Sequence, residues 1–132
     1  MTYYADTSAL VKLVAPEAES AALRAWIAEN ALMLASAAIA RTELLRAIRR
    51  AQVDEEALTR GRDLLARLLL IDATDDVLDR AGTLDPATVR SLDAIHLAAA
   101  LALGDELDGI VTYDDRMADA ARGLGIIVLA PR

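Results

Sequence analysis

The sequence predicts a single α/β domain, residues 1–132, with a mainly parallel central sheet flanked by helices. Short apolar runs alternate with helix-forming segments along the chain, a pattern typical of strand–helix–strand units. Residues 68–71 are continuously apolar, as in a strand buried on both faces. The 132 residues are 55% hydrophobic but only 3% aromatic, so Ala, Leu, Val and Ile must build a core in which helices pack closely on a sheet.

The first strand is expected over residues 2–5, where aromatic and β-branched residues follow one another without a breaker. Asp6 or Thr7 can cap a helix over residues 8–14, which stops before Pro16. Further helices are expected over residues 17–29, 37–52, 55–67, 75–82, 91–102 and 114–122. Further strands are expected over residues 32–35, 68–71, 110–113 and 126–129, with polar turns at 83–86 and 105–109. The N-caps expected for four of these helices are Ser36, Asp54, Thr74 and Ser91.

Composition narrows the possible functions. The chain contains no cysteine, so thiolate metal sites and disulfides are excluded, and oxygen ligands or the single His96 must hold any metal. Oxygen ligands favour Mg²⁺ or Mn²⁺. The apolar runs at 31–40 and 94–103 are too short to span a bilayer, and the first residues do not resemble a secretory signal, so a cytoplasmic protein is expected.

The net charge of −7 does not by itself predict a nucleic-acid binder. Thirteen of the 14 basic residues are nevertheless Arg, which can bind phosphate through two hydrogen bonds. Four arginines are candidates for phosphate contacts, with surface solubility and salt bridging as the alternative role: Arg46, Arg49, Arg50 and Arg116.

Four acidic residues lie where an α/β sheet would bring them together. Asp6 and Asp114 directly follow predicted strands, so both are expected at the carboxyl edge of the sheet, where ligands of such sheets bind. Asp93 opens a helix that should start at the same edge, and Glu43 needs only that its helix crosses nearby. Carboxylates gathered in one cleft repel one another and require cations, and one or two Mg²⁺ ions there can activate a water against a phosphodiester.

Each of these residues also has an ordinary structural interpretation. Asp6 can serve as a helix N-cap, and Asp93 is favoured by the helix dipole in the first turn of its helix. Glu43 can form a surface pair with Arg46. The hydroxyls of Ser8 and Thr112 can orient an acid, a water or a phosphate oxygen, or only support local capping and strand structure.

His96 lies one turn after Asp93 on a very apolar helix. A lone histidine in such a place is more typical of a hydrogen-bonded core residue than of a metal ligand.

The chain resembles a PIN-domain ribonuclease, specifically the VapC-type toxin of a type II toxin–antitoxin system. Each matching motif is weak alone, but four occur in the order of the family, and the whole chain has the usual extent of the family. The motifs are Tyr4-Ala5-Asp6-Thr7-Ser8-Ala9-Leu10, Arg41-Thr42-Glu43, Leu92-Asp93-Ala94-Ile95-His96-Leu97-Ala98 and Val111-Thr112-Tyr113-Asp114-Asp115-Arg116-Met117.

The resemblance implies a metal-dependent endoribonuclease that uses a metal-activated water to hydrolyse RNA phosphodiesters and leaves a 5′-phosphate. It implies Mg²⁺, or Mn²⁺, as cofactor, a cognate antitoxin as partner and a homodimer. The acids that it assigns to the metal are Asp6, Glu43, Asp93 and Asp114, with Asp115 as an alternative to Asp114. It assigns supporting hydroxyls to Ser8 and Thr112 and helix packing to His96.

Three other interpretations are weighed against this one. A phospho-acceptor receiver domain needs a Lys near the last strand, and the only Lys is Lys12 in the first helix, with Asp72 as the only candidate acceptor. An inactive PIN-like binding module would not need the complete acid set. A plain α/β domain would use the four acids as caps, and it would gain no stability from Mg²⁺.

Overall fold

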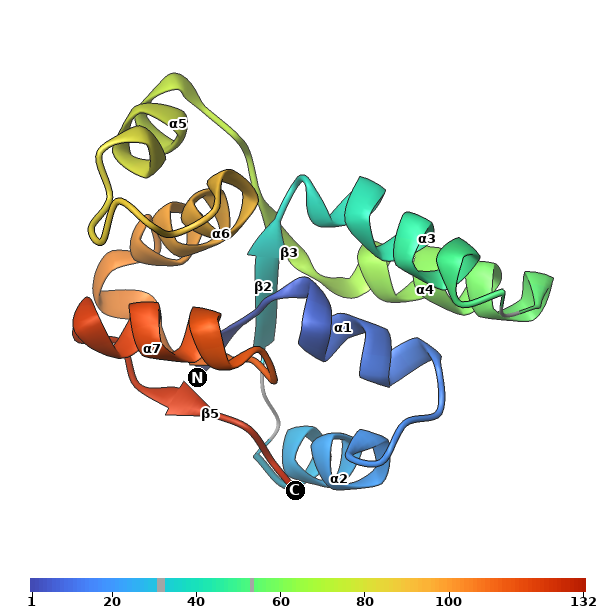
Figure 1. Ribbon diagram of the computed structural model, residues 1–132. Coiled ribbons are helices and arrows are strands. Elements are labelled where there is room, and N and C mark those ends of the chain that lie inside the picture. The colour runs from blue at the N-terminus through green and yellow to red at the C-terminus, as the bar shows by residue number, and fades with distance from the viewer. Residues whose placement is uncertain (31–32, 53) are drawn as a thin grey trace.

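The computed structural model describes residues 1–30, 33–52 and 54–132, and a parallel sheet lies at its centre (Figure 1). In this part of the chain the sheet has five strands in the order β3-β2-β1-β4-β5, and every neighbouring pair is parallel. The predicted α/β class with a parallel central sheet is therefore confirmed. The strands are β1 (Thr2–Ala5), β2 (Met33–Ala37), β3 (Leu69–Ile71), β4 (Leu107–Val111) and β5 (Val128–Leu129).

Helices cover both faces of the sheet (Figure 1). Helices α5, α6 and α7 pack on one face through a core that includes Leu97 and Met117. Helices α1 to α4 pack on the other face through a second core that includes Leu10 and Leu44. The bounds are α1 (Thr7–Val14), α2 (Ser20–Asn30), α3 (Ala40–Arg50), α4 (Glu55–Arg67), α5 (Asp75–Gly82), α6 (Ser91–Leu101) and α7 (Asp115–Gly123), with a 3₁₀ turn at Gly104–Glu106.

The two central strands are buried on both faces because their side chains alternate between the two cores. In β1, Tyr4 belongs to the core under α6 and Ala5 to the core under α1. In β4, Ile110 and Val111 divide in the same way. Both strands therefore end in the middle of the molecule, with helices on both sides of the residues that follow them.

Two predicted helix caps are wrong. Ser36 lies inside β2, fully buried, and its hydroxyl donates to the Ala5 carbonyl of β1 at 2.7 Å, so it serves the sheet and does not start a helix. Helix α3 begins only at Ala40. Ser91 is the first residue of α6, and Arg90 occupies the N-cap position without a side-chain hydrogen bond. The predicted caps Asp54 and Thr74 are confirmed.

Several boundaries also differ from the prediction. Helix α2 begins at Ser20 and not at residue 17, because residues 17–20 form a turn in which the Glu17 N–H donates to the Ser20 hydroxyl. Strand β4 starts at Leu107, inside the predicted polar turn, since pairing with β1 satisfies its backbone despite Asp108 and Gly109. Strand β5 covers only Val128–Leu129. Residue 32 of the second predicted strand lies outside the described residues.

Gly109 is required where β4 passes between β1 and the segment before β5. A Cβ atom at this position would lie 2.9 Å from the backbone oxygen of Ile127 and 3.1 Å from the ring of Tyr3. We expect Gly109→Ala to lower the free energy of unfolding by about 1–3 kcal/mol, the usual cost of overpacking. Urea denaturation measures the change, with Gly82→Ala as the control because nothing lies within 4 Å of its Cβ. Equal stability of the two variants would contradict the expectation.

In the described part of the chain, no helix has both the length and the apolar character that crossing a membrane requires.

Candidate functional site

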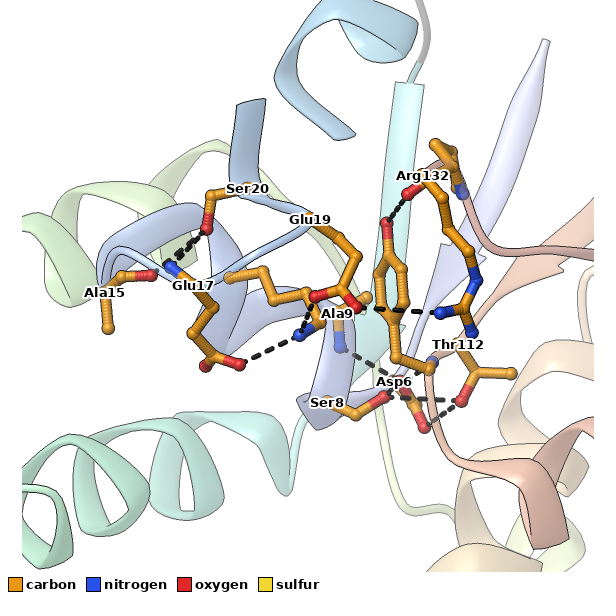
Figure 2. Close-up of polar contacts among 12 residues, drawn as sticks. Asp6, Ser8, Ala9, Ala15, Glu17, Glu19, Ser20, Thr112 and Arg132 are labelled. Carbon is orange, nitrogen blue, oxygen red and sulfur yellow. Dashed lines mark hydrogen bonds and ion pairs between the residues drawn. The ribbon is translucent and has the colours of Figure 1, made fainter. Parts of the chain in front are cut away.

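Asp6 lies directly after β1 and is 4% exposed. As the N-cap of α1, its Oδ1 accepts from the Ala9 N–H at 3.2 Å, and it also accepts from the Ser8 hydroxyl at 2.6 Å. Its Oδ2 accepts from the Thr112 hydroxyl at 2.7 Å (Figure 2). Burial raises the pKa of Asp6, and the two hydroxyl bonds only partly oppose this. The same carboxylate is therefore both a cap and a charge held at the end of β1.

The end of β4 is tied to the same point. Thr112 follows β4 and is buried, and its Oγ1 accepts from the Asp114 N–H at 3.1 Å. The Ser8 hydroxyl in turn accepts from the Tyr113 N–H at 3.0 Å. Ser8 and Thr112 therefore join Asp6 to the segment that carries Asp114, over more than 100 residues of sequence.

Asp114 is the N-cap of α7, where its Oδ1 accepts from the N–H groups of Arg116 and Met117 at 2.9 and 3.2 Å. The negative charge of Asp114 contributes to raising the pKa of Asp93. Asp114 and Asp115 are both exposed. What distinguishes Asp114 is that its carboxylate caps α7 and that its charge acts on Asp93.

Glu43 lies in the first turn of α3, and its partner is His96 rather than Arg46, the partner in its ordinary structural interpretation. Its Oε1 accepts from His96 Nε2 at 2.6 Å and from the Thr7 hydroxyl at 3.0 Å. Burial tends to raise the pKa of Glu43, but the hydrogen bonds from His96 and Thr7 outweigh burial and lower it. Glu43 is thus held as a carboxylate by hydrogen-bond donors from two other helices.

Asp93 lies in the first turn of α6 and is half-buried. Among the described residues no group donates a hydrogen bond to its carboxylate. Its pKa is raised first by burial and then by the charge of Asp114, with Glu43 contributing in the same direction. The four predicted acids therefore come from four different segments of the chain. The charges of two of them, Asp114 and Glu43, act on Asp93.

The grouping is open rather than tight. Over residues 1–30, 33–52 and 54–132, no three Asp, Glu, His or Cys side chains lie close enough together to hold one metal ion among them. The four carboxylates therefore do not form a compact ligand cluster in the described residues.

The raised pKa of Asp93 makes stability depend on pH. Its contribution to stability is fully present below the ordinary value of 3.8 and is lost as the pH rises through the raised pKa of the folded state. Metal-free protein should therefore gain thermal stability relative to Asp93→Asn as the pH falls from neutral toward 4. Thermal midpoints of both proteins across this range, measured in chelator, test the prediction. A difference that does not change with pH would contradict it.

Two pockets border the acids, and each contains two arginines. One, of about 570 Å³, lies between the α6 N-terminus and α7 and is lined by Asp93, Arg90 and Arg116. The other, of about 430 Å³, is lined by Glu43, Arg46 and Arg50. Sequence reasoning identified three of these arginines but missed Arg90, which precedes the Asp93 motif by two residues.

Lys12 is not available for the chemistry of a receiver domain. Its Nζ is within 2.8 Å of both Glu17 and Glu19 and lies 4.8 Å from the centre of the Tyr113 ring. A receiver site needs a lysine that can reach a phosphoryl group, whereas the only lysine of this chain joins α1 to the turn before α2.

Comparison with known proteins assigns this chain to a family. The family model for the PIN domain matches residues 3–123. Ribonuclease VapC46 of Mycobacterium tuberculosis is 48% identical over 128 residues, which cover 97% of this chain and 96% of the relative. Ribonuclease VapC47 of the same species is 40% identical over 132 residues, again covering 97% of this chain and 96% of the relative.

Two solved structures have the same fold at low sequence identity. One is VapBC2 from Rickettsia felis bound to a DNA fragment from its promoter, with a TM-score of 0.72 at 17% identity over all of both chains. The other is M. tuberculosis VapC20, described as a sarcin-ricin loop cleaving toxin, with a TM-score of 0.76 at 15% identity over 99% of this chain and 100% of that one. Together with the curated relatives, these findings show that the chain belongs to the PIN-domain family and, within it, to the VapC ribonucleases.

Proposed function

We propose that this protein is a metal-dependent endoribonuclease that acts in the cytoplasm as the toxin of a toxin–antitoxin pair. The observation that carries the proposal is its 48% identity, over nearly the full length of both chains, to a protein named as a VapC ribonuclease. The chemical support is that Asp6 and Asp114 follow the neighbouring strands β1 and β4, and that the charges of Asp114 and Glu43 act on Asp93.

The oxygen donors fit Mg²⁺, or Mn²⁺, better than other metals. Mg²⁺ typically binds one or two carboxylates and keeps several waters, which suits an open group of acids. Asp93 offers both oxygens, Glu43 offers Oε2, and Asp6 Oδ2 accepts one hydrogen bond and so keeps a lone pair. We propose these three residues and Asp114 as the acids of the metal site, which would hold the ion directly or through its waters. When bound, the cation would supply a more acidic water and stabilise negative charge on the phosphate.

Side chains of the protein would bind the phosphates and accept the proton of the attacking water. Arg90 and Arg116 in the pocket beside Asp93, and Arg46 and Arg50 in the pocket beside Glu43, would hold the phosphates that flank the scissile bond. A carboxylate of the site would accept the proton of the attacking water as its oxygen bonds to phosphorus. The P–O3′ bond would break and the departing O3′ would take a proton from solvent, leaving a 3′-hydroxyl on one product and a 5′-phosphate on the other.

We propose two protein partners as well. A neighbour with the same fold is described as a VapBC2 assembly, which supports a cognate antitoxin for this chain. We also propose that the chain forms a homodimer. Co-purification from native expression, followed by light scattering of the isolated toxin, tests both assignments.

RNA cleavage by the purified chain tests the proposed function. We expect total cellular RNA to be cut with Mg²⁺ or Mn²⁺ present, cleavage to stop in EDTA, and mapped products to carry 5′-phosphates. The matching antitoxin should suppress cleavage. If neither ion supports cleavage of transfer, ribosomal or messenger RNA, and neither raises the thermal midpoint, the chain is a PIN-like binding module without this activity.

A further inference from the structure

A buried chain of hydrogen bonds leads from the sheet to the acid site. The Tyr4 hydroxyl of β1 lies 2.6 Å from His96 Nδ1, and His96 Nε2 lies 2.6 Å from Glu43 Oε1. Tyr4 is fully buried and His96 is 2% exposed, so water does not compete for the bond between them, whereas the bond to Glu43 is part-buried. Three elements, β1, α6 and α3, are thereby joined through one imidazole ring.

The chemistry of the partners fixes where the protons lie. An ionised Glu43 carboxylate can only accept, so His96 Nε2 must carry a hydrogen and donate it. The Tyr4 phenol keeps its hydrogen at neutral pH and can donate it to Nδ1, which lies 2.6 Å away. A carboxylate hydrogen bond to a histidine ring is the usual device by which proteins fix the ring orientation and proton position.

Both donors to Glu43 act on the same oxygen. His96 Nε2 and the Thr7 hydroxyl bind Oε1, while in the described residues nothing donates to Oε2. The carboxylate is thus held by one oxygen and has the other available. Asp93 has no hydrogen-bond donor in the described part of the chain, whereas Glu43 is oriented before any ligand binds.

We propose that His96 is a positioning residue of the ribonuclease site, which acts by holding Glu43 Oε1 through Nε2–H with its ring fixed by Tyr4. The inference rests on the proposed function, and it assigns His96 a role beyond the helix packing expected from sequence. His96 does not contact RNA or metal in this role, and its effect reaches the reaction through Glu43.

The first test needs neither RNA nor metal. His96 is the only histidine, so a long-range ¹H–¹⁵N spectrum of the metal-free protein shows one imidazole ring without assignment. We expect a proton fixed on Nε2, and a changed Nε2 signal in Glu43→Gln. An Nε2 without a proton, or rapid exchange between the two tautomers, would overturn the proposal.

The second test measures cleavage. We expect His96→Leu, which removes the donor at similar volume, to lower kcat by about 10- to 100-fold at unchanged KM, the usual cost of losing a group that orients a ligand. His96→Gln keeps an N–H donor and should recover most of the loss. Tyr4→Phe should have a smaller effect of the same kind, because it removes the hydrogen bond to His96 Nδ1 but leaves the imidazole ring and its Nε2–H in place.

Leu97→Ala controls for simple destabilisation. Leu97 is fully buried next to His96 on α6, so its truncation should lower the thermal midpoint while kcat below the transition stays near wild type. Equal kcat losses in His96→Leu and Leu97→Ala, or no rescue by His96→Gln, would reduce His96 to a packing residue. If the wild-type protein does not cut RNA, the proposed function fails, but the NMR result still decides whether the ring holds Glu43.

Discussion

Asp93→Asn should abolish measurable RNA cleavage while leaving the fold intact. Loss of a group that merely supports a metal ligand costs about 10- to 100-fold, so loss of a ligand carboxylate itself should lower kcat by more than about 100-fold. The carboxylate of Asp93 accepts no hydrogen bond from protein among the described residues, and the negative charges of Asp114 and Glu43 disfavour its ionised form. Its carboxylate is therefore positioned for a cation rather than for the fold.

The same substitution should raise the thermal midpoint of the metal-free protein at neutral pH. The ionised Asp93 is disfavoured in the folded state by burial and by its acidic neighbours, and a neutral amide removes that cost. Mn²⁺ should then stabilise the wild type more than the variant. Asp79→Asn is the matched control, since it makes the same chemical change at an exposed position of α5.

Cleavage rate and thermal midpoint of Asp93→Asn, taken together, distinguish a catalytic role of Asp93 from a structural one. A variant that is inactive but at least as stable as wild type has lost chemistry and not folding. Cleavage within about tenfold of wild type would place Asp93 outside the machinery, because even supporting groups usually cost that much. A large fall in the midpoint would instead show that Asp93 is an ordinary helix-start residue.

The fold and the positions of the acids followed from local sequence. Strand β1 and the capping role of Asp6 could be predicted because a short β-branched and aromatic run leads directly into a helix. That Asp6 and Asp114 share one edge follows from the rule that parallel strands end at the same side of the sheet. These predictions needed only the identity of neighbouring residues.

Contacts between distant segments could not be predicted in this way. The sequence favoured Arg46 as the partner of Glu43, because residues three apart on a helix are neighbours. The structure instead joins Glu43 to His96, 53 residues away, since packing of α3 and α6 around the sheet brings a buried ring to that carboxylate. Ser36 was misread for the same reason, because its partner, the Ala5 carbonyl, lies on another strand.

Thr112→Val should weaken both folding and catalysis. Its hydroxyl donates to Asp6 Oδ2 at 2.7 Å and accepts from the Asp114 N–H at 3.1 Å, and it is 1% exposed. Valine keeps the shape but leaves a buried carboxylate with one donor fewer. Because hydrogen bonds to buried charged groups are costly to lose, we expect the free energy of unfolding to fall by about 2–3 kcal/mol.

Catalysis should fall by about 10- to 100-fold, because the hydroxyl orients Asp6 and the segment that carries Asp114. Thr112→Ser is the control that separates the hydroxyl from the methyl group. It should keep most of the activity and lose only about 1 kcal/mol for the methyl group removed from the core. Urea denaturation and cleavage rates of the pair test this directly.

The two variants separate the packing of the Thr112 methyl group from the hydrogen bonds of its hydroxyl. If Ser loses activity while Val keeps it, the methyl packing of Thr112 matters and its hydroxyl does not, and Asp6 must be held by Ser8 and the Ala9 N–H alone. If only Val loses activity, the hydroxyl is what allows a carboxylate at the end of β1 to stay buried, capped and available at once. Burial raises the pKa of Asp6, so the donors around it decide whether it can act as an anion in the site.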